Sequence, residues 1–100
     1  MIYKLKTKSG ATEAVIDDNC GITKFYAIAD ALTHDLKIDF LTQVDETENL
    51  DWDFKFHDQF LTLHYNVFNG VSILPVSKKS NRRRNNAVVE VAHFLQQKAF

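Results

Sequence analysis

Asp53 and His64 are the two residues of this sequence best suited to acid–base chemistry. If Asp58-Gln59 forms a two-residue turn, the flanking strands pair so that these two side chains stand directly opposite each other. A carboxylate beside an imidazole orients the ring, which is the arrangement that a general base uses. Charged pairs across two strands are also common on solvated sheet faces. The sequence places no serine or cysteine nucleophile beside the pair, so a small enzyme using His64 and Asp53 is an alternative interpretation only.

Motifs for metals and cofactors are missing from the sequence. No two of its four histidines have the spacing of a metal-ligand motif: His34, His57, His64 and His93. Cys20 lies near the start of a predicted helix, where the dipole can lower the pKa of a thiol, although a buried or incidental cysteine is the more common case. There is no glycine-rich phosphate-binding loop. We therefore expect no metal, no cofactor and no catalytic residue.

A basic segment at residues 78–86 contains Arg82, Arg83 and Arg84 just before a predicted helix. The helix dipole disfavours positive charge at that end, so local stability does not explain the three arginines. Together with the free N–H groups of the helix start they could hold an anion, such as a phosphate or a partner's carboxylates. Nucleic-acid binding is a lesser alternative, because the interleaved residues are polar rather than aromatic. A solvated loop is the simplest interpretation.

The stretch at residues 50–76 organises the predicted fold. Apolar and polar residues alternate in it with the period of two that is typical of half-buried strands. With a turn at Asp58-Gln59, Phe54 pairs with Leu63 and Trp52 with Tyr65. This pairing places four large apolar residues on one face, which we expect to be covered by helices: Trp52, Phe54, Leu63 and Tyr65.

A second turn is predicted at Asn69-Gly70, because both residues tolerate the positive φ angles of a type I′ turn. This turn pairs Tyr65 with Leu74 and places Leu74 and Val76 on the covered face. The opposite face then carries five apolar residues: Phe60, Phe68, Val71, Ile73 and Pro75. An apolar cluster among polar residues on an open face can mark a contact surface, unless the N-terminal segment or the basic segment covers it. The candidate partner-binding residues are Asp51, Asp53, His64, Asn66, Phe68 and Ile73.

The remaining chain supplies two helices and the outer strands. Strands are predicted at residues 2–8, 14–16 and 36–44 by their alternation. A helix running to about His34, with caps among residues 17–19, carries the apolar stripe Ile22, Phe25, Tyr26, Ala29 and Leu32. The final helix, capped by Asn85 or Asn86, carries the stripe Val88, Val91, Ala92, Leu95 and Ala99. The economical packing is an α+β two-layer sandwich, with an antiparallel sheet of about five to six strands and both helices on one face.

Composition narrows the function classes. One hundred residues, of which 45% are hydrophobic, fit a single domain over residues 1–100, and the net charge of −1 gives no global attraction to nucleic acid or membrane. A lone cysteine, no signal-peptide pattern and no long apolar run favour a cytoplasmic protein. Acidic residues cluster in one hairpin and could dock a basic protein: Asp45, Glu46, Glu48, Asp51, Asp53 and Asp58.

These features favour a non-catalytic protein-binding or inhibitory module, of an immunity or regulatory type, over an enzyme. Its expected partner is another protein, which includes a second copy of the chain as a homodimer. A nucleic acid is the less favoured partner, and no membrane partner is expected.

Overall fold

The computed structural model describes residues 3–6, 12–77 and 82–98. The described chain forms β1 (Tyr3–Lys6), β2 (Thr12–Asp17), α1 (Ile22–Asp35), β3 (Phe40–Asp45), β4 (Asn49–Phe56), β5 (Gln59–Asn66), β6 (Gly70–Pro75) and α2 (Arg82–Gln96). Residues 78–81 of the basic segment and Ala99 of the second helical stripe lie outside the described residues. Order and type of the elements agree with the sequence prediction.

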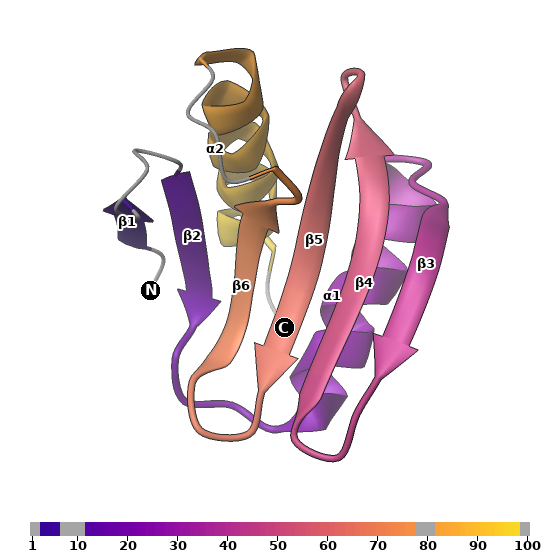
Figure 1. The fold of residues 1–100 in the computed structure, drawn as a ribbon, viewed down its shortest axis with the longest axis vertical. Coiled ribbons are helices and arrows are strands. Elements are labelled where there is room, and N and C mark those ends of the chain that lie inside the picture. Colours follow the sequence, from indigo (N-terminus) through magenta and orange to yellow (C-terminus); the bar gives the residue numbers. More distant parts are fainter. Residues whose placement is uncertain (1–2, 7–11, 78–81, 99–100) are drawn as a thin grey trace.

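The strands form one six-stranded antiparallel sheet with the order β1-β2-β6-β5-β4-β3. Both helices lie behind the same face of this sheet, α2 behind β2 and β6 and α1 behind β4 and β5 (Figure 1). The predicted two-layer α+β sandwich is therefore confirmed. We call the sheet surface opposite the helices the open face.

The hydrophobic core lies between the helices and the sheet. Its largest fully buried side chains come from both layers: Phe25, Ile28, Leu32, Phe54, Leu61, Leu63, Val71, Ile73, Val88, Val91 and Leu95. The Trp52 ring stands edge-on to Phe25 of α1, with 5.0 Å between the ring centroids. Tyr65 is also buried, so the predicted helix-facing set of β4 and β5 is confirmed.

Both ends of α1 differ from the prediction. Gly21 is the N-cap and provides no side-chain hydrogen bond, whereas residues 17–19 precede the helix. At the other end, Lys37 has a φ of 57°. The N–H groups of Leu36 and Ile38 there both donate to the Leu32 carbonyl, at 3.1 and 3.2 Å, so the chain folds back over the last turn of the helix. Residues 36–39 therefore end the helix, and the predicted strand at 36–44 begins only at Phe40.

The apolar face of α1 is also rotated relative to the predicted stripe. Ile28 is fully buried although the prediction omitted it, while Ile22 and Tyr26 are more than 40% exposed. The stripe predicted from spacing alone is wider than the surface of the helix that contacts the sheet, so the residues at its edge are exposed to solvent.

Helix α2 begins at Arg82, so the three arginines form its first turn instead of preceding it. Asn85 and Asn86 therefore lie inside the helix, and the prediction that one of them is its cap was wrong. The Asn85 Oδ1 atom accepts a hydrogen bond from the backbone N–H of Thr12 at 3.0 Å. This contact ties the helix to β2, because a side-chain amide satisfies a strand donor.

The β4–β5 turn is formed by His57 and Asp58, which have φ angles of 50° and 62°. Positive φ at both central residues is the requirement of a type I′ turn, so Asp58-Gln59 was the wrong pair. Phe54 consequently pairs with Leu61 instead of Leu63, a shift of two residues. Because side chains alternate with a period of two, a shift of two leaves every residue on its predicted face.

The β5–β6 turn has the larger consequence. Among residues 66–70 only Gly70 has a positive φ, of 77°, and the N–H of Asn69 donates to the Asn66 carbonyl. The loop is therefore longer than two residues, and Tyr65 pairs with Val71 instead of Leu74, a shift of three. An odd shift exchanges the two faces of β6.

The faces of β6 were accordingly predicted wrongly. Val71, Ile73 and Pro75 belong to the helix-facing side, and Ile73 is fully buried in the core. Leu74 instead pairs with Thr62 and shares its open face. Ile73 is therefore removed from the candidate partner-binding residues.

Candidate binding site on the open face

His64 and Asp51 form the best-defined polar contact of the open face. Their strands pair them directly, and the His64 Nδ1 atom lies 2.6 Å from the Asp51 Oδ1 atom. Because an ionised carboxylate only accepts hydrogen bonds, Nδ1 carries the proton in this contact. The predicted partner, Asp53, accepts instead from the Thr62 hydroxyl at 2.7 Å. The two-residue register shift explains why His64 pairs with Asp51 instead of Asp53.

Ser72 lies on the other side of His64, as its partner on β6. Ser72, His64 and Asp51 therefore form a row across three adjacent strands. The sequence prediction missed Ser72, because the Asn69-Gly70 turn placed it opposite a different part of β5. The missed signal is Asn66, whose side chain stabilises the longer turn: its Oδ1 atom accepts from the N–H of Phe68 at 2.8 Å.

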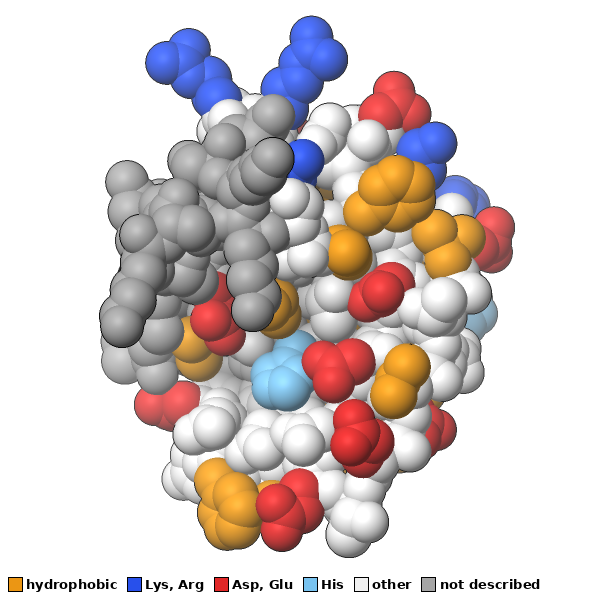
Figure 2. Space-filling view, viewed as in Figure 1, with side chains coloured by type: hydrophobic (Ala, Val, Ile, Leu, Met, Phe, Trp, Pro, Cys, Tyr) orange, Lys and Arg blue, Asp and Glu red, His pale blue; other side chains and the backbone are white. Residues whose placement is uncertain are grey.

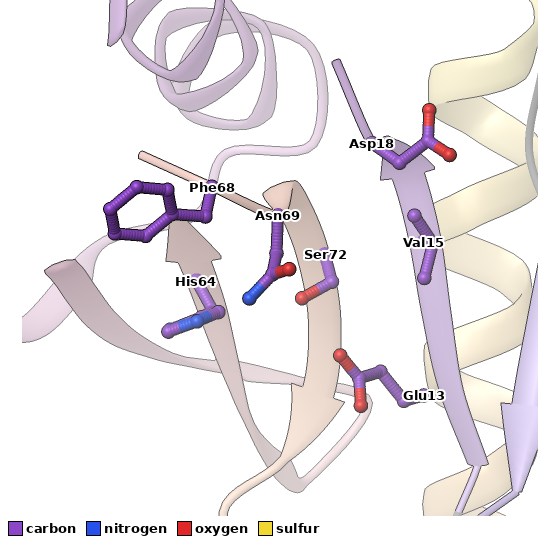
Figure 3. Close-up of a pocket in the computed structure, with 7 residues that line it drawn as sticks. All are labelled: Glu13, Val15, Asp18, His64, Phe68, Asn69 and Ser72. Carbon is purple, nitrogen blue, oxygen red and sulfur yellow. The ribbon is translucent and has the colours of Figure 1, made fainter. Parts of the chain in front are cut away.

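A pocket of about 420 Å³ opens beside this row, at the end of the sheet where the β5–β6 turn meets β2. Seven of the residues that the structure describes line it: Glu13, Val15, Asp18, His64, Phe68, Asn69 and Ser72 (Figure 3). They come from β2 and the segment after it, from β5, from the turn and from β6. The volume falls within the range of about 300 to 1,000 Å³ that is usual for ligand pockets. We call this cavity the His64 pocket.

Gly70 allows the pocket to form, since it brings the turn against β2. A Cβ atom at this position would lie 1.9 Å from the backbone carbonyl oxygen of Asp17. The register of β2 against β6 shifts between Val15 and Asp17, which is a β-bulge. Bulges bend a strand and redirect its side chains, so the end of β2 turns toward the β5–β6 turn.

The other predicted partner-binding residues have separate roles. The Asn66 Nδ2 atom donates to the Asn49 Oδ1 atom at 2.6 Å, and its Oδ1 atom holds the turn, so its contacts are structural. Phe68 is 75% exposed at the rim of the pocket. Asp51 and His64 are partly exposed and ordered by each other.

Acidic and hydrophobic side chains are interspersed on the open face (Figure 2). Phe60 pairs with Lys55 there and is 51% exposed. Val44 pairs with Asp51 and is 50% exposed. The basic side chains coloured in the figure lie toward its upper edge, away from the acidic group in the middle and lower part.

The basic residues of α2 are not part of the His64 pocket. Arg83 instead lines a shallow hollow of about 310 Å³ with Asp58, Ala87 and other residues near the β4–β5 turn, at the opposite end of β5. In this hollow the His57 Nε2 atom lies 2.6 Å from the Glu90 Oε2 atom. The acidic residues that the sequence analysis grouped together do not form one cluster either, because Asp58 lies at the opposite end of the β4–β5 hairpin from Asp51.

Cys20 is half-buried, and its thiol donates to the Asp17 carbonyl at 3.8 Å. Burial, together with the nearby Asp17 charge, raises the pKa of the Cys20 thiol above its ordinary value. This direction is opposite to the lowering that a helix start could cause. Among the described residues, no group of three or more His, Cys, Asp or Glu side chains is placed to hold a metal ion.

Within the described chain, neither helix is long and apolar enough to cross a membrane. Comparisons with protein-family models, with curated proteins and with solved structures found no match to this chain.

Proposed function

We propose that this chain is a cytoplasmic, non-catalytic protein-binding module that docks the basic surface of a partner protein on its open face. The observation that carries the proposal is the composition of this face. Its centre is a hydrogen-bonded His64–Asp51 pair, with the half-exposed Val44 beside Asp51 and the half-exposed Phe60 further along β5 on the same face. Aromatic anchors between polar groups are typical of the centre of a protein interface.

Charge supports a basic partner. Asp51 and Asp53 lie on the open face. The exposed β3–β4 loop, at the lower end of the sheet in Figure 1, adds Glu46 and Glu48. Opposite charges on two surfaces speed their encounter and exclude partners of the wrong sign. An inhibitory, immunity-type action is one form of this function, in which the module covers a basic active site of its partner.

The test is capture of a partner from the native host followed by affinity measurements with purified proteins. Asp51→Asn and Phe68→Ser should each weaken binding by about tenfold or more, as expected when a central contact is lost. Asp30→Asn removes the same charge from the helix layer and should change the affinity by less than about twofold. Loss of affinity in Asp30→Asn but in neither open-face variant would contradict the proposal.

One observation favours the enzymatic alternative, namely the row of Ser72, His64 and Asp51. A serine hydrolase needs the histidine to take the hydroxyl proton, as well as donors for the oxyanion. The described residues show the His64–Asp51 hydrogen bond but none between His64 and Ser72. We therefore expect that a fluorophosphonate probe does not label Ser72. Labelling of the wild type that disappears in Ser72→Ala would establish the hydrolase instead.

Nucleic-acid binding through Arg82, Arg83 and Arg84 stays the lesser proposal. Arg82 and Arg83 are exposed in the first turn of α2, where they are accessible to phosphates. Salt-dependent affinity of the wild type for RNA or DNA, lost when all three are changed to glutamine, would favour this alternative over protein binding.

A further inference from the structure

We propose that the His64 pocket is a receptor for an arginine side chain, supplied by the basic partner protein. This inference rests on the proposed function and names the chemical group that the open face recognises. Three features of the pocket carry it: the hydroxyl of the largely buried Ser72, an excess of acceptors and an exposed aromatic ring at the rim.

The hydroxyl belongs to Ser72. This residue is only 5% exposed, yet it lines the pocket. No hydrogen bond joins its hydroxyl to another described residue, and no buried side-chain oxygen of the described chain lacks a partner, so the Ser72 oxygen must reach the pocket. A hydroxyl that has no partner in the protein and faces a pocket is free to form a hydrogen bond with a ligand.

The acceptors surround this hydroxyl. Figure 3 shows the Glu13 carboxylate and the Asn69 amide near Ser72, whereas the Asp18 carboxylate lies at the upper end of β2 and points away from them. Among the described residues that line the pocket, Glu13 places a carboxylate beside Ser72, and none is a lysine or an arginine. Such a site repels anions and attracts cations, since opposite charges close to each other in a partly enclosed site are weakly screened.

The shape of the acceptor set selects a guanidinium over an ammonium. A guanidinium presents five N–H donors in a rigid plane, while an ammonium is a compact, strongly hydrated charge. Glu13, Asn69 and Ser72 come from three different segments, so their acceptor atoms face the ligand from several sides. The ring of Phe68, which is 75% exposed, offers a surface on which the plane can stack.

The experiment is an NMR titration of the ¹⁵N-labelled full chain with N-acetyl-arginine amide. We expect shifts of the backbone amides of Asn69, Gly70 and Ser72. The lysine analogue should bind about fivefold more weakly, and the uncharged citrulline analogue should cause no shift at these amides. Equal shifts with citrulline, shifts confined to other elements, or no shift at about 50 mM ligand would each overturn the inference.

Matched variants locate the binding. Glu13→Gln removes one carboxylate and should weaken arginine-amide binding by about tenfold, as for other hydrogen bonds to charged groups. Ser72→Ala should weaken it less, by about threefold. Asp58→Asn removes the same charge at the other end of β5 and should leave the affinity unchanged. If Asp58→Asn weakens binding as much as Glu13→Gln does, general charge attraction explains the result and the pocket is not the receptor.

The source of the arginine is tested with the captured partner. N-acetyl-arginine amide should compete with the partner, and Glu13→Gln should weaken both ligands. If the partner binds the open face of the Glu13→Gln variant as tightly as that of the wild type, the pocket is not an arginine receptor, but the proposed function stands. If N-acetyl-arginine amide binds in the pocket but no protein binds through the open face, the proposed function fails. The inference that a partner protein supplies the arginine then fails with it.

Discussion

Gly70 occupies a position where a side chain is excluded for two separate reasons. Its φ of 77° is unfavourable for residues with a Cβ atom, and that atom would also lie 1.9 Å from the Asp17 carbonyl oxygen. The conformation alone costs about 1 to 2 kcal/mol. Gly70→Ala should therefore reduce the free energy of unfolding by more than about 2 kcal/mol in denaturant melts, since the clash adds to the conformational cost.

Two control variants separate the two causes. Asparagine tolerates the left-handed conformation better than alanine, but it has the same Cβ atom. If the clash dominates, Gly70→Asn should be nearly as destabilised as Gly70→Ala. Gly21→Ala introduces a Cβ atom with nothing within 4 Å, so it should cost less than about 1 kcal/mol. A stable Gly70→Asn protein would show that the close approach to Asp17 is readily relieved.

Asp17 links the end of β2 to α1 through its charge. Lys24 donates to the Asp17 Oδ2 atom at 2.7 Å and the N–H of Asn19 donates to Oδ1 at 2.9 Å. The hydrogen bond from Lys24 is the largest cause that lowers the pKa of Asp17 below its ordinary value of 3.8. The folded state therefore holds this proton less tightly than the unfolded chain does.

The contribution of Asp17 to stability is fully present above about pH 4 and is lost as the pH falls through the lowered pKa of the folded state. Asp17→Asn should reduce the free energy of unfolding at pH 7 and flatten its decline below about pH 4, measured by denaturant melts across pH. Asp30→Asn, on the exposed side of α1, serves as the charge-matched control. An unchanged acid decline in Asp17→Asn would show that other groups cause it.

The β4–β5 hairpin ends in a type I′ turn made of residues that are only moderately suited to it. Asp58 has a φ of 62°, and its contact with Lys55, 3.6 Å between the charged atoms, is largely exposed. A pair of this kind contributes little to stability. Asp58→Gly should therefore raise the free energy of unfolding by up to about 1 kcal/mol, because the glycine adopts positive φ without strain.

Asp58→Val is the opposite test, since a β-branched residue strongly resists positive φ. It should lower the free energy of unfolding by at least about 1 kcal/mol in the same melts. Equal stabilities of the glycine and valine variants would contradict the type I′ geometry of this turn.

The two hairpins also show which parts of the fold the sequence determines. Alternation of apolar residues was sufficient to predict the strands, their order in the chain and the covered face of β4 and β5. Turn geometry was not predictable in the same way, because Asn69-Gly70 suits both a two-residue turn and the end of a longer one. The choice between them depends on the Asn66 side chain, which accepts hydrogen bonds from the turn.

The candidate site was predictable only in part for the same reason. His64 and an aspartate were expected together, and an even register shift exchanged Asp53 for Asp51 while keeping the face. Ser72 and Ile73 changed faces, because the shift at β6 was odd. The pocket itself also needs Glu13 and Asp18, which are brought beside β6 by the pairing of β2 with β6. No local pattern in the sequence indicates that long-range pairing.

The whole molecule is nearly neutral, with 12 basic and 13 acidic residues, but the charges of the part that the structure describes are unevenly distributed. Carboxylates gather on the open face and the loop below it, whereas Arg82 and Arg83 lie at the start of α2. Because steering depends on the field near the docking surface and not on net charge, the association rate with a basic partner should fall as ionic strength rises.

Glu48 provides the test of this steering, since its side chain is exposed in the β3–β4 loop. Glu48→Gln should slow association by about two- to fivefold at low salt, with little change in the dissociation rate, because a charge at the rim acts mainly on the encounter. Asp30→Asn removes the same charge from the helix layer and should leave both rates unchanged. If the two variants slow association equally in stopped-flow measurements, the net charge of the molecule controls the encounter, and the acidic open face has no special part in attracting the partner.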